Sequence, residues 1–565
     1  MIFCTDRYNH CTSFWRNHKS GVLPLTGFVQ LGIMKKNAKS NAISARRGRR
    51  DCRRYGGGHL AQLRPGARPL FAKRPFGEGR SARRQAEKRG GCEMAEAIAR
   101  PKKRHTDMTK GPIAKTLFFF TLPMFLGNLF QQLYNMVDSI VVGNFVGPSA
   151  LGAVGCTFPI VFVAIAVASG LGMGCSVVTS QYLGAKDYGS VRMSVTTSLI
   201  FNLVVSIALS ILGMAASGTV LKWMRTSPET IDMATEYLFI YFLGLTFMFM
   251  YNTIAGTFRA LGDSKTPLYY LILSSFLNIG LDLLFVIQFG MGVAGVAWAT
   301  MIAQGVCAVF SFIHLMNRLG QFEKRADHRV FSTEMLRTIV RLAIPSMLQQ
   351  LSVSISSVLC QTVINGFGPM LVSGYTAANK IESIAGMPIM NLGMAVSTFV
   401  AQNIGAGKME RVKKGFKSAL IMVLIFAAAS CVLLLLFGPN LVGIFVNREV
   451  EGAAEVINWG TYHLVHMAFI LFIQGLMFTG EGMLKGAGDM NLLVFCTLTG
   501  MVLRTICVFA LAPKVGFAAI WFSIGLGSLT EVIIAFWRYF QGGWKEKAIV
   551  SDSGDEAPEE AGAEA

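Results

Sequence analysis

The segment SQYLGAKD at residues 180–187 returns as AQNIGAGK at residues 401–408. In both copies a glutamine, Gln181 or Gln402, is followed three residues later by Gly-Ala, and the two copies lie 221 residues apart. Two further pairs keep nearly this spacing: Pro123 with Pro345, and Gly262-Asp263 with Gly488-Asp489. The repetition indicates that the chain contains two copies of one structural unit.

The composition around these repeats is that of a membrane protein. The chain has 565 residues, of which 52% are hydrophobic and 15% charged, whereas soluble domains are roughly 25% charged. A span needs about 20 apolar residues to cross a bilayer. From Gly111 onward we find twelve such stretches. They are approximately 113–146, 149–182, 191–216, 230–258, 265–289, 292–316, 334–361, 370–403, 415–438, 453–483, 490–511 and 516–540.

Six spans in each copy determine how the copies are related. Because six is even, both copies start on the same side of the membrane and are parallel repeats, with a cavity expected between them. The predicted fold is therefore an all-α polytopic membrane protein, with twelve transmembrane helices arranged as two six-helix bundles.

The basic residues predict the orientation. The formal charge is +20, but residues 1–100 hold 22 Lys+Arg against 6 Asp+Glu, so most of the charge is in the leader and gives no reason to expect a nucleic-acid partner. Beyond residue 100, 24 Lys+Arg lie on one side of the predicted spans and 4 on the other. The positive-inside rule then places both termini in the cytoplasm of a cell-membrane protein.

We divide the chain into five parts: a basic unstructured leader (1–110), an N-terminal bundle (111–320), a cytoplasmic linker (321–333), a C-terminal bundle (334–540) and an acidic cytoplasmic tail (541–565). Three interpretations of the leader stay open. It is a disordered tail that touches anionic lipid, a targeting segment, or an untranslated stretch that precedes a start at Met94 or Met108.

The motifs of energy-coupled enzymes are absent from the sequence. The phosphate-binding pattern G-x-x-x-x-G-K-[ST] does not occur, and the 11 cysteines contain no C-x-x-C pair that would indicate zinc or a redox site. We expect no catalytic residue, no metal and no cofactor. Any pumping would run on an ion gradient or on a partner chain.

Two acids lie inside apolar spans, where a charge is costly and faces a cavity or a partner. Asp138 is in the first span and Asp282 in the fifth. Each has polar neighbours at helical spacing: Asn278 one turn before Asp282, and Gln131, Tyr134 and Asn135 before Asp138.

Depth is expected to bring these groups together. Both spans run outward, and each acid lies about seven residues, or roughly 10 Å, from the outer end. Thr300 lies at a similar depth in the sixth span, which runs inward. Asp138, Asn278, Asp282 and Thr300 would form an all-oxygen site for a proton or a hard cation such as Na⁺. The alternative is that each acid reaches the outer interface or is satisfied by a neighbouring helix.

Other polar residues within spans are weaker candidates. Gln131, Tyr134, Asn135, Gln349 and Glu382 are possible cavity-lining residues. Glu382 could instead pair locally with Lys380, and Glu481 could neutralise Arg504 in an adjacent helix. His463 and His466 fit an interfacial position better than a metal or proton site.

On these residues the chain resembles the multidrug and toxic compound extrusion (MATE) family of secondary antiporters. The resemblance covers about 111–540 and rests on YNMVDSIVVGNFVG, SQYLGAKD, FRALGDSKTP, LNIGLDLLFVIQFGMGVAGVAWAT and AQNIGAG. It implies two bundles in a V around a central cavity. It also implies a cation site at Asp138, Asn278, Asp282 and Thr300, as in bacterial members that use the N-terminal bundle. Another branch binds the cation through acids in the seventh and tenth spans, where this chain has Ser352 and Gln474. A site of that kind is therefore not expected here, unless Glu481 takes the place of one of these acids.

The expected function is efflux of small, amphipathic, often cationic organic compounds, including antibiotics, by a monomer coupled to inward H⁺ or Na⁺ flux. One alternative is a lipid-linked oligosaccharide flippase of the same superfamily. A second is a non-transporting membrane receptor or assembly factor, which the duplicated bundles and the intramembrane acids disfavour.

Overall fold

The structure, a computed structural model, describes residues 106–224, 226–322, 329–446 and 452–549, so most of the leader and the acidic end of the tail lie outside the described residues. Twelve helices in the described part are long and apolar enough to cross a membrane. Each stretch expected to span has its helix, and the described part contains helices and turns without a strand. The predicted fold class is confirmed.

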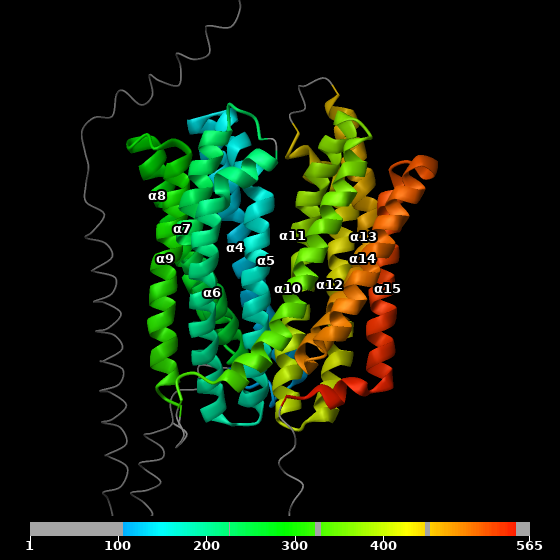
Figure 1. The fold of residues 1–565 in the computed structure, drawn as a ribbon. Helices are drawn as coiled ribbons and strands as arrows, with labels where there is room; N and C mark the ends of the chain where they lie inside the picture. The colour runs from blue at the N-terminus through cyan, green and yellow to red at the C-terminus, as the bar shows by residue number, and fades with distance from the viewer. Residues whose placement is uncertain (1–105, 225, 323–328, 447–451, 550–565) are drawn as a thin grey trace, which may run out of the picture. The chain divides into compact units, whose positions relative to one another are not determined.

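The helices form two sets of six (Figure 1). The first set is α4 (Ile113–Val141), continued by the π-helical turn η1 (Val142–Val146), α5 (Pro148–Gly184), α6 (Tyr188–Trp223), α7 (Ile231–Ala260), α8 (Lys265–Asp282), continued by η2 (Leu283–Gln288), and α9 (Gly292–Leu319). The second set is α10 (Thr333–Asn365), α11 (Pro369–Gly405), α12 (Met409–Gly443), α13 (Ala453–Ala487), α14 (Met490–Val515) and α15 (Ala518–Gln541), followed by the short η3 (Gly543–Lys547).

The two bundles repeat one packing scheme. In the first, α7 packs against α5, α6 and α9; in the second, α13 packs against α11, α12 and α15. These partners correspond one to one when the chain is divided between α9 and α10. Between the bundles, α5 packs against α10 and α11, and α4 packs against α11.

Several helices extend beyond their apolar stretches because polar groups support their ends. The Asp187 carboxylate accepts a hydrogen bond of 3.0 Å from the backbone N–H of Ser190, so α6 begins at Tyr188, three residues before the expected span. Such a cap supplies a partner for an N–H that lacks one in the first helical turn. α12 likewise begins at Met409, with an exposed ion pair of 2.6 Å between Lys413 and Glu410 in its first turns.

The bundles meet at the end of the unit that carries the α5–α6 and α11–α12 turns, here called the basic end because the charge pattern predicts it to be cytoplasmic. The repeated glutamines connect the bundles there. Gln181 Nε2 donates to the Gly486 carbonyl (3.1 Å), and Gln402 Nε2 donates to the Ala260 carbonyl (2.8 Å). The repeated motif is therefore a symmetric clasp between the two halves.

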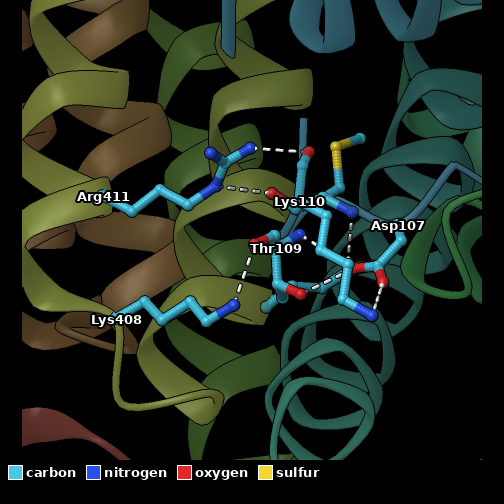
Figure 2. Close-up of polar contacts among 7 residues, drawn as sticks. Asp107, Thr109, Lys110, Lys408 and Arg411 are labelled. Atoms are coloured by element: carbon cyan, nitrogen blue, oxygen red, sulfur yellow. Dashed lines mark hydrogen bonds and ion pairs between the residues drawn. The ribbon is translucent and has the colours of Figure 1, made fainter. Parts of the chain in front are cut away.

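A segment before the first helix, Thr106–Pro112, also lies across the basic end; we call it the N-terminal strap. Its Thr106 N–H donates to the Gly262 carbonyl of the first bundle (3.0 Å). Figure 2 shows Lys408 and Arg411 of the second bundle directed at the strap. Lys408 Nζ donates to the Thr109 carbonyl at 3.0 Å, and Arg411 donates to the Lys110 carbonyl at 2.8 Å.

Both ends of the described chain are thus more ordered than their composition suggested. Met108, expected to lie in the unstructured leader, is fully buried, and its carbonyl accepts a hydrogen bond from Asn403 (3.1 Å). Beyond α15, Trp544 is buried and the Ile549 N–H donates to Gln181 Oε1 (2.8 Å). Apolar contacts and backbone hydrogen bonds stabilise these segments, because the folded bundles supply partners that local composition does not reveal.

Candidate functional site

A cavity of about 820 Å³ lies between the two bundles. Both halves contribute side chains to its wall, and most of them are polar or aromatic. They include Asn128, Gln131, Tyr134, Asn135, Asp138, Tyr237, Tyr241, Arg259 and Thr300 from the first half, and Gln349, Asn391, Gln474, Glu481, Lys485, Arg504 and Glu531 from the second. The halves touch within this lining through Asn128 Nδ2, which donates to Asn391 Oδ1 at 3.0 Å.

Two carboxyl groups lie close together in the first bundle, Asp138 on the cavity wall and Asp282 behind it. Asp138 lies on α4, and Asp282 is the last residue of α8 and is fully buried. The two carboxyl groups lie close enough to interact directly. Asp138 Oδ1 and both oxygens of Asp282 have no other partner among the described residues. Carboxyl oxygens without partners are chemically able to take up a proton or a hard cation.

The other two residues predicted for this site also form a pair. Asn278 Nδ2 donates to Thr300 Oγ1 at 3.3 Å, while Asn278 Oδ1 is buried without a partner. Both residues line a small recess beside the main cavity, together with Tyr134. Asn278 lies one turn before Asp282 on α8. Residues on α4, α8 and α9 thus supply oxygen atoms to this region, and several of these oxygens accept no hydrogen bond. A hard cation is bound by oxygen atoms of this kind.

A π-helical turn follows each acid. η1 (Val142–Val146) begins four residues after Asp138, and η2 (Leu283–Gln288) begins directly after Asp282. Single π-helical turns within helices are frequent at functional sites, because the wider turn re-aims the side chains next to it. Here the two turns contact each other, so the acid-bearing helix ends are irregular at the same level.

Tyr237 of α7 belongs to the same region, although it was not among the site residues predicted from the sequence. It lines the cavity and lies close enough to Asp138 and Asp282 for their charges to act on its hydroxyl group. The available signal was its depth, since Tyr237 is the seventh residue of α7 from the same end of the bundle. Because aromatic residues are common in spans, depth alone did not single it out.

The structure places four of the five expected cavity-lining residues on the cavity wall: Gln131, Tyr134, Asn135 and Gln349. Glu382 is not among the lining residues. Its carboxylate lies 3.3 Å from Nε2 of His463, on the neighbouring α13. Lys380, its expected local partner, instead lies over the ring of Phe445, 5.8 Å from the ring centre. The rotation of α11 therefore turns Glu382 into the bundle and away from the cavity.

His463 is buried within the second bundle, with 1% of its surface exposed. One further expectation for this bundle is wrong. Glu481 pairs with Lys485, one turn further along α13, at 2.9 Å, and not with Arg504. Glu531 of α15 is a buried acid on the cavity wall that spacing did not identify as a site residue.

The described residues contain no group of three or more His, Cys, Asp or Glu side chains that could hold a metal ion.

The sequence profile of the MatE family matches residues 123–284 and 345–510. The chain belongs to the MatE family. The two matched segments begin at the repeated prolines, Pro123 and Pro345, so the family match contains the same duplication that the structure shows.

Curated relatives of this MatE-family chain match it over most of its length. The probable multidrug resistance protein YpnP of Bacillus subtilis (strain 168) is 30% identical over 448 residues, covering 79% of this chain and 99% of YpnP. The multidrug export protein MepA of Staphylococcus saprophyticus is 23% identical over 381 residues, covering 67% of this chain and 83% of MepA.

Among solved structures, the chain is similar to the outward-facing conformation of a multidrug resistance MATE family transporter of the MOP superfamily. The TM-score is 0.73 with 25% sequence identity, and the alignment covers 79% of this chain and all of the other. The protein is thus a multi-pass membrane protein of a transporter family.

Proposed function

We propose that this MatE-family protein is a cation-coupled antiporter that exports small organic compounds across the cell membrane. The observation that carries the proposal is the pair of facing acids, Asp138 and Asp282, beside the cavity between the bundles. The relatives named for multidrug resistance or export support efflux. They favour it over the flipping of lipid-linked oligosaccharides.

The cavity suits amphipathic, cationic substrates. Its volume of about 820 Å³ is in the range of pockets that hold drug-sized molecules, about 300–1,000 Å³. Tyr134, Tyr237 and Tyr241 supply aromatic faces, which attract organic cations. Asp138 supplies negative charge on the same wall.

Alternating access in this proposal uses the two bundles as moving parts. The clasp of Gln181 and Gln402 closes the basic end. Since the charge pattern predicts this end to be cytoplasmic, the described state would face outward. Its similarity to an outward-facing transporter structure supports that assignment. Both termini would then be cytoplasmic, and one chain would suffice for transport because its own halves enclose the cavity.

Coupling follows from the acid pair. A proton or Na⁺ arriving from outside neutralises one negative charge between Asp138 and Asp282. A cationic substrate on the same wall is then held less strongly and leaves outward. By linkage, the substrate must weaken cation binding by the same factor that the cation weakens substrate binding.

The test compares Asp138→Asn and Asp282→Asn in everted vesicles, with ethidium as the transported probe. We expect each variant to lose gradient-driven uptake of ethidium, while Asp232→Asn, which removes an exposed acid from the first turn of α7, transports normally. An imposed pH gradient without Na⁺, or a Na⁺ gradient without a pH difference, identifies the ion. Full transport by both Asn variants would refute the proposed coupling site.

A further inference from the structure

A second pair of carboxyl groups lies in the C-terminal bundle. Glu481 of α13 and Glu531 of α15 are 7% and 8% exposed, and both line the cavity. Their carboxyl groups lie close enough for the charge of each to act on the other. These helices correspond to α7 and α9 of the first half, whereas Asp138 and Asp282 lie on α4 and α8. The second pair is therefore not the symmetry copy of the first.

Two glycines allow the second pair to meet. α14 and α15 cross so closely that a Cβ on Gly527 would lie 2.8 Å from the Gly500 carbonyl. A Cβ on Gly500 would lie 2.7 Å from the Cγ and Oε1 of Glu531. The Glu531 side chain thus passes directly over the bare backbone of α14 toward Glu481, a path that any larger residue at position 500 would block.

The surrounding bases leave the carboxyl group of Glu531 without a bonded partner. Lys485 Nζ bonds to Glu481 Oε2 at 2.9 Å. Arg504 of α14 lines the cavity nearby, but its buried Nε has no hydrogen-bond partner. Glu531 Oε2 is likewise buried without a partner. On α15 itself, Arg538 is occupied by Asp489 at 2.8 Å, and from α14 the thiol of Cys496 also faces the acids.

We propose that Glu481 and Glu531 form a second proton-binding site of this transporter, with the proton on Glu531. Two facing carboxylates repel strongly in a low-dielectric environment, and one shared proton turns this repulsion into a hydrogen bond. This inference rests on the proposed antiport function for its role in coupling, but the site itself rests on the contacts of α13, α14 and α15.

The composition and size of the cluster favour a proton over other cations. With two acids and the two bases Lys485 and Arg504, the cluster is neutral without the proton and carries +1 with it, so both states are accessible. A metal ion would need several more oxygen ligands than this cluster offers. An organic cation would meet Lys485 and Arg504 beside the acids. A proton, unlike a metal ion or an organic cation, binds without any added space between the helices.

Loss of the proton would also reorganise the cluster. An ionised Glu531 is repelled by Glu481 and attracted by Arg504, whose Nε lacks a partner. The side chain would then turn from α13 toward α14. Proton exchange with the cavity would in this way change the contacts among three helices of the C-terminal bundle, and each cycle would carry a second proton besides any cation at Asp138 and Asp282.

The test is an infrared pH titration of the full-length protein in lipid nanodiscs, which follows the C=O band of protonated carboxyl groups. We expect Glu531→Gln to lose one titrating component and Asp282→Asn a different one. Glu531→Asp, which keeps the carboxyl group, should retain a shifted component. Glu229→Gln, at an exposed position, should change neither of the two components.

An unchanged set of titrating bands in Glu531→Gln would overturn the proposal. Retention of fold is checked by gel filtration, and Glu481→Gln gives a second variant in which the component assigned to Glu531 must shift. If Asp138→Asn and Asp282→Asn transport normally but Glu531→Gln still loses its band, the second proton site stands and only the proposed role of the first pair fails.

Discussion

At the scale of single residues, His463 shows how neighbours select one form of a side chain. Trp521 Nε1 donates to His463 Nδ1 at 3.0 Å, so Nδ1 is the acceptor and the ring proton is on Nε2, facing Glu382 at 3.3 Å. The ring of Trp521 is stacked on His466, with centres 3.9 Å apart. One indole thus orients two histidines, which explains their spacing without a metal.

Replacing Trp521 by Phe should destabilise the C-terminal bundle modestly. The change leaves Nδ1 of buried His463 without a donor while keeping an aromatic ring at the stacking position. Leaving one buried acceptor without its donor costs about 1–3 kcal/mol. Thermal unfolding in detergent should therefore show a lower Tm for Trp521→Phe and no change for Trp537→Phe, whose ring is 56% exposed. Equal Tm values for Trp521→Phe and the parent would show that the hydrogen bond contributes nothing.

The sequence predicted some site residues and missed others for a physical reason. Asp138 and Asp282 lie at one depth, and depth follows from residue counts along straight helices. Whether Glu382 faces the cavity, or whether Glu481 meets Lys485 or Glu531, depends on how each helix is rotated. Helices that are apolar on nearly all sides carry little information about rotation, so these partners could be found only in the folded bundle.

At the scale of elements, the N-terminal strap is held by hydrogen bonds to its backbone and by the buried side chain of Met108. Among its polar side chains, Asp107 orders the strap's own turn. Partial burial acts to raise its pKa, but hydrogen bonds from the Thr109 side chain and backbone, together with Lys110, outweigh burial and lower the pKa. Asp107 therefore stays ionised at neutral pH and orders the turn that brings Thr109 and Lys110 to the second bundle (Figure 2).

Arg411→Ala should loosen this strap. Arg411 donates to the Met108 carbonyl at 3.2 Å and to the Lys110 carbonyl at 2.8 Å. Hydrogen bonds from a charged donor contribute about 1.5–3 kcal/mol each when buried, and less here because Arg411 is partly exposed. Limited trypsin digestion should cleave after Lys110 faster in Arg411→Ala than in the parent, as judged by the N-terminal sequence of the product.

The matched control for the strap is Lys413→Ala. Lys413 lies on the same helix and pairs with Glu410 at 2.6 Å in an exposed position. It should not alter cleavage after Lys110. If Arg411→Ala and Lys413→Ala are cleaved at the same rate, the strap is held by Met108 and its apolar contacts rather than by Arg411.

The helices themselves could be predicted closely, because twelve long apolar stretches allow few alternatives. The π-helical turns η1 and η2 could not. Their sequences, VGNFV and LLFVIQ, have no proline or charge that marks a change of hydrogen-bond pattern. They arise where α4 and α8 pack at their ends, which is a property of the bundle and not of the local sequence.

At the scale of the whole molecule, the duplicated Gly-Asp motif forms the same ion pair in both halves. Asp263 pairs with Arg318 at 2.7 Å in the first bundle, and Asp489 pairs with Arg538 at 2.8 Å in the second. Each pair connects the turn after the fourth helix of its bundle to the sixth helix of that bundle. Equal ion pairs on both sides keep the partners of Gln181 and Gln402 in equivalent positions.

The same symmetry makes Gly184 and Gly405 critical for closing the basic end. A Cβ on Gly184 would overlap the backbone oxygen of Gln402, and a Cβ on Gly405 would overlap that of Gln181. Since these contacts are to backbone, no side-chain rotation relieves them. Gly184→Ala and Gly405→Ala should therefore destabilise the described state, by about 1–3 kcal/mol on the scale of an overpacked core.

Hydrogen exchange measured by mass spectrometry in nanodiscs checks this expectation. Peptides around residues 181–188 and 402–409 should exchange faster in both variants, by roughly tenfold for each 1.4 kcal/mol. Gly155→Ala on α5, with open space around the new Cβ, and Gly386→Ala on α11, with an ordinary contact of 3.9 Å, are matched controls that should leave exchange unchanged. Because the two halves close on each other, the variant at position 184 must also loosen 402–409, and that at 405 must loosen 181–188. Faster exchange confined to the mutated half would mean that the bundles are not closed by a shared clasp.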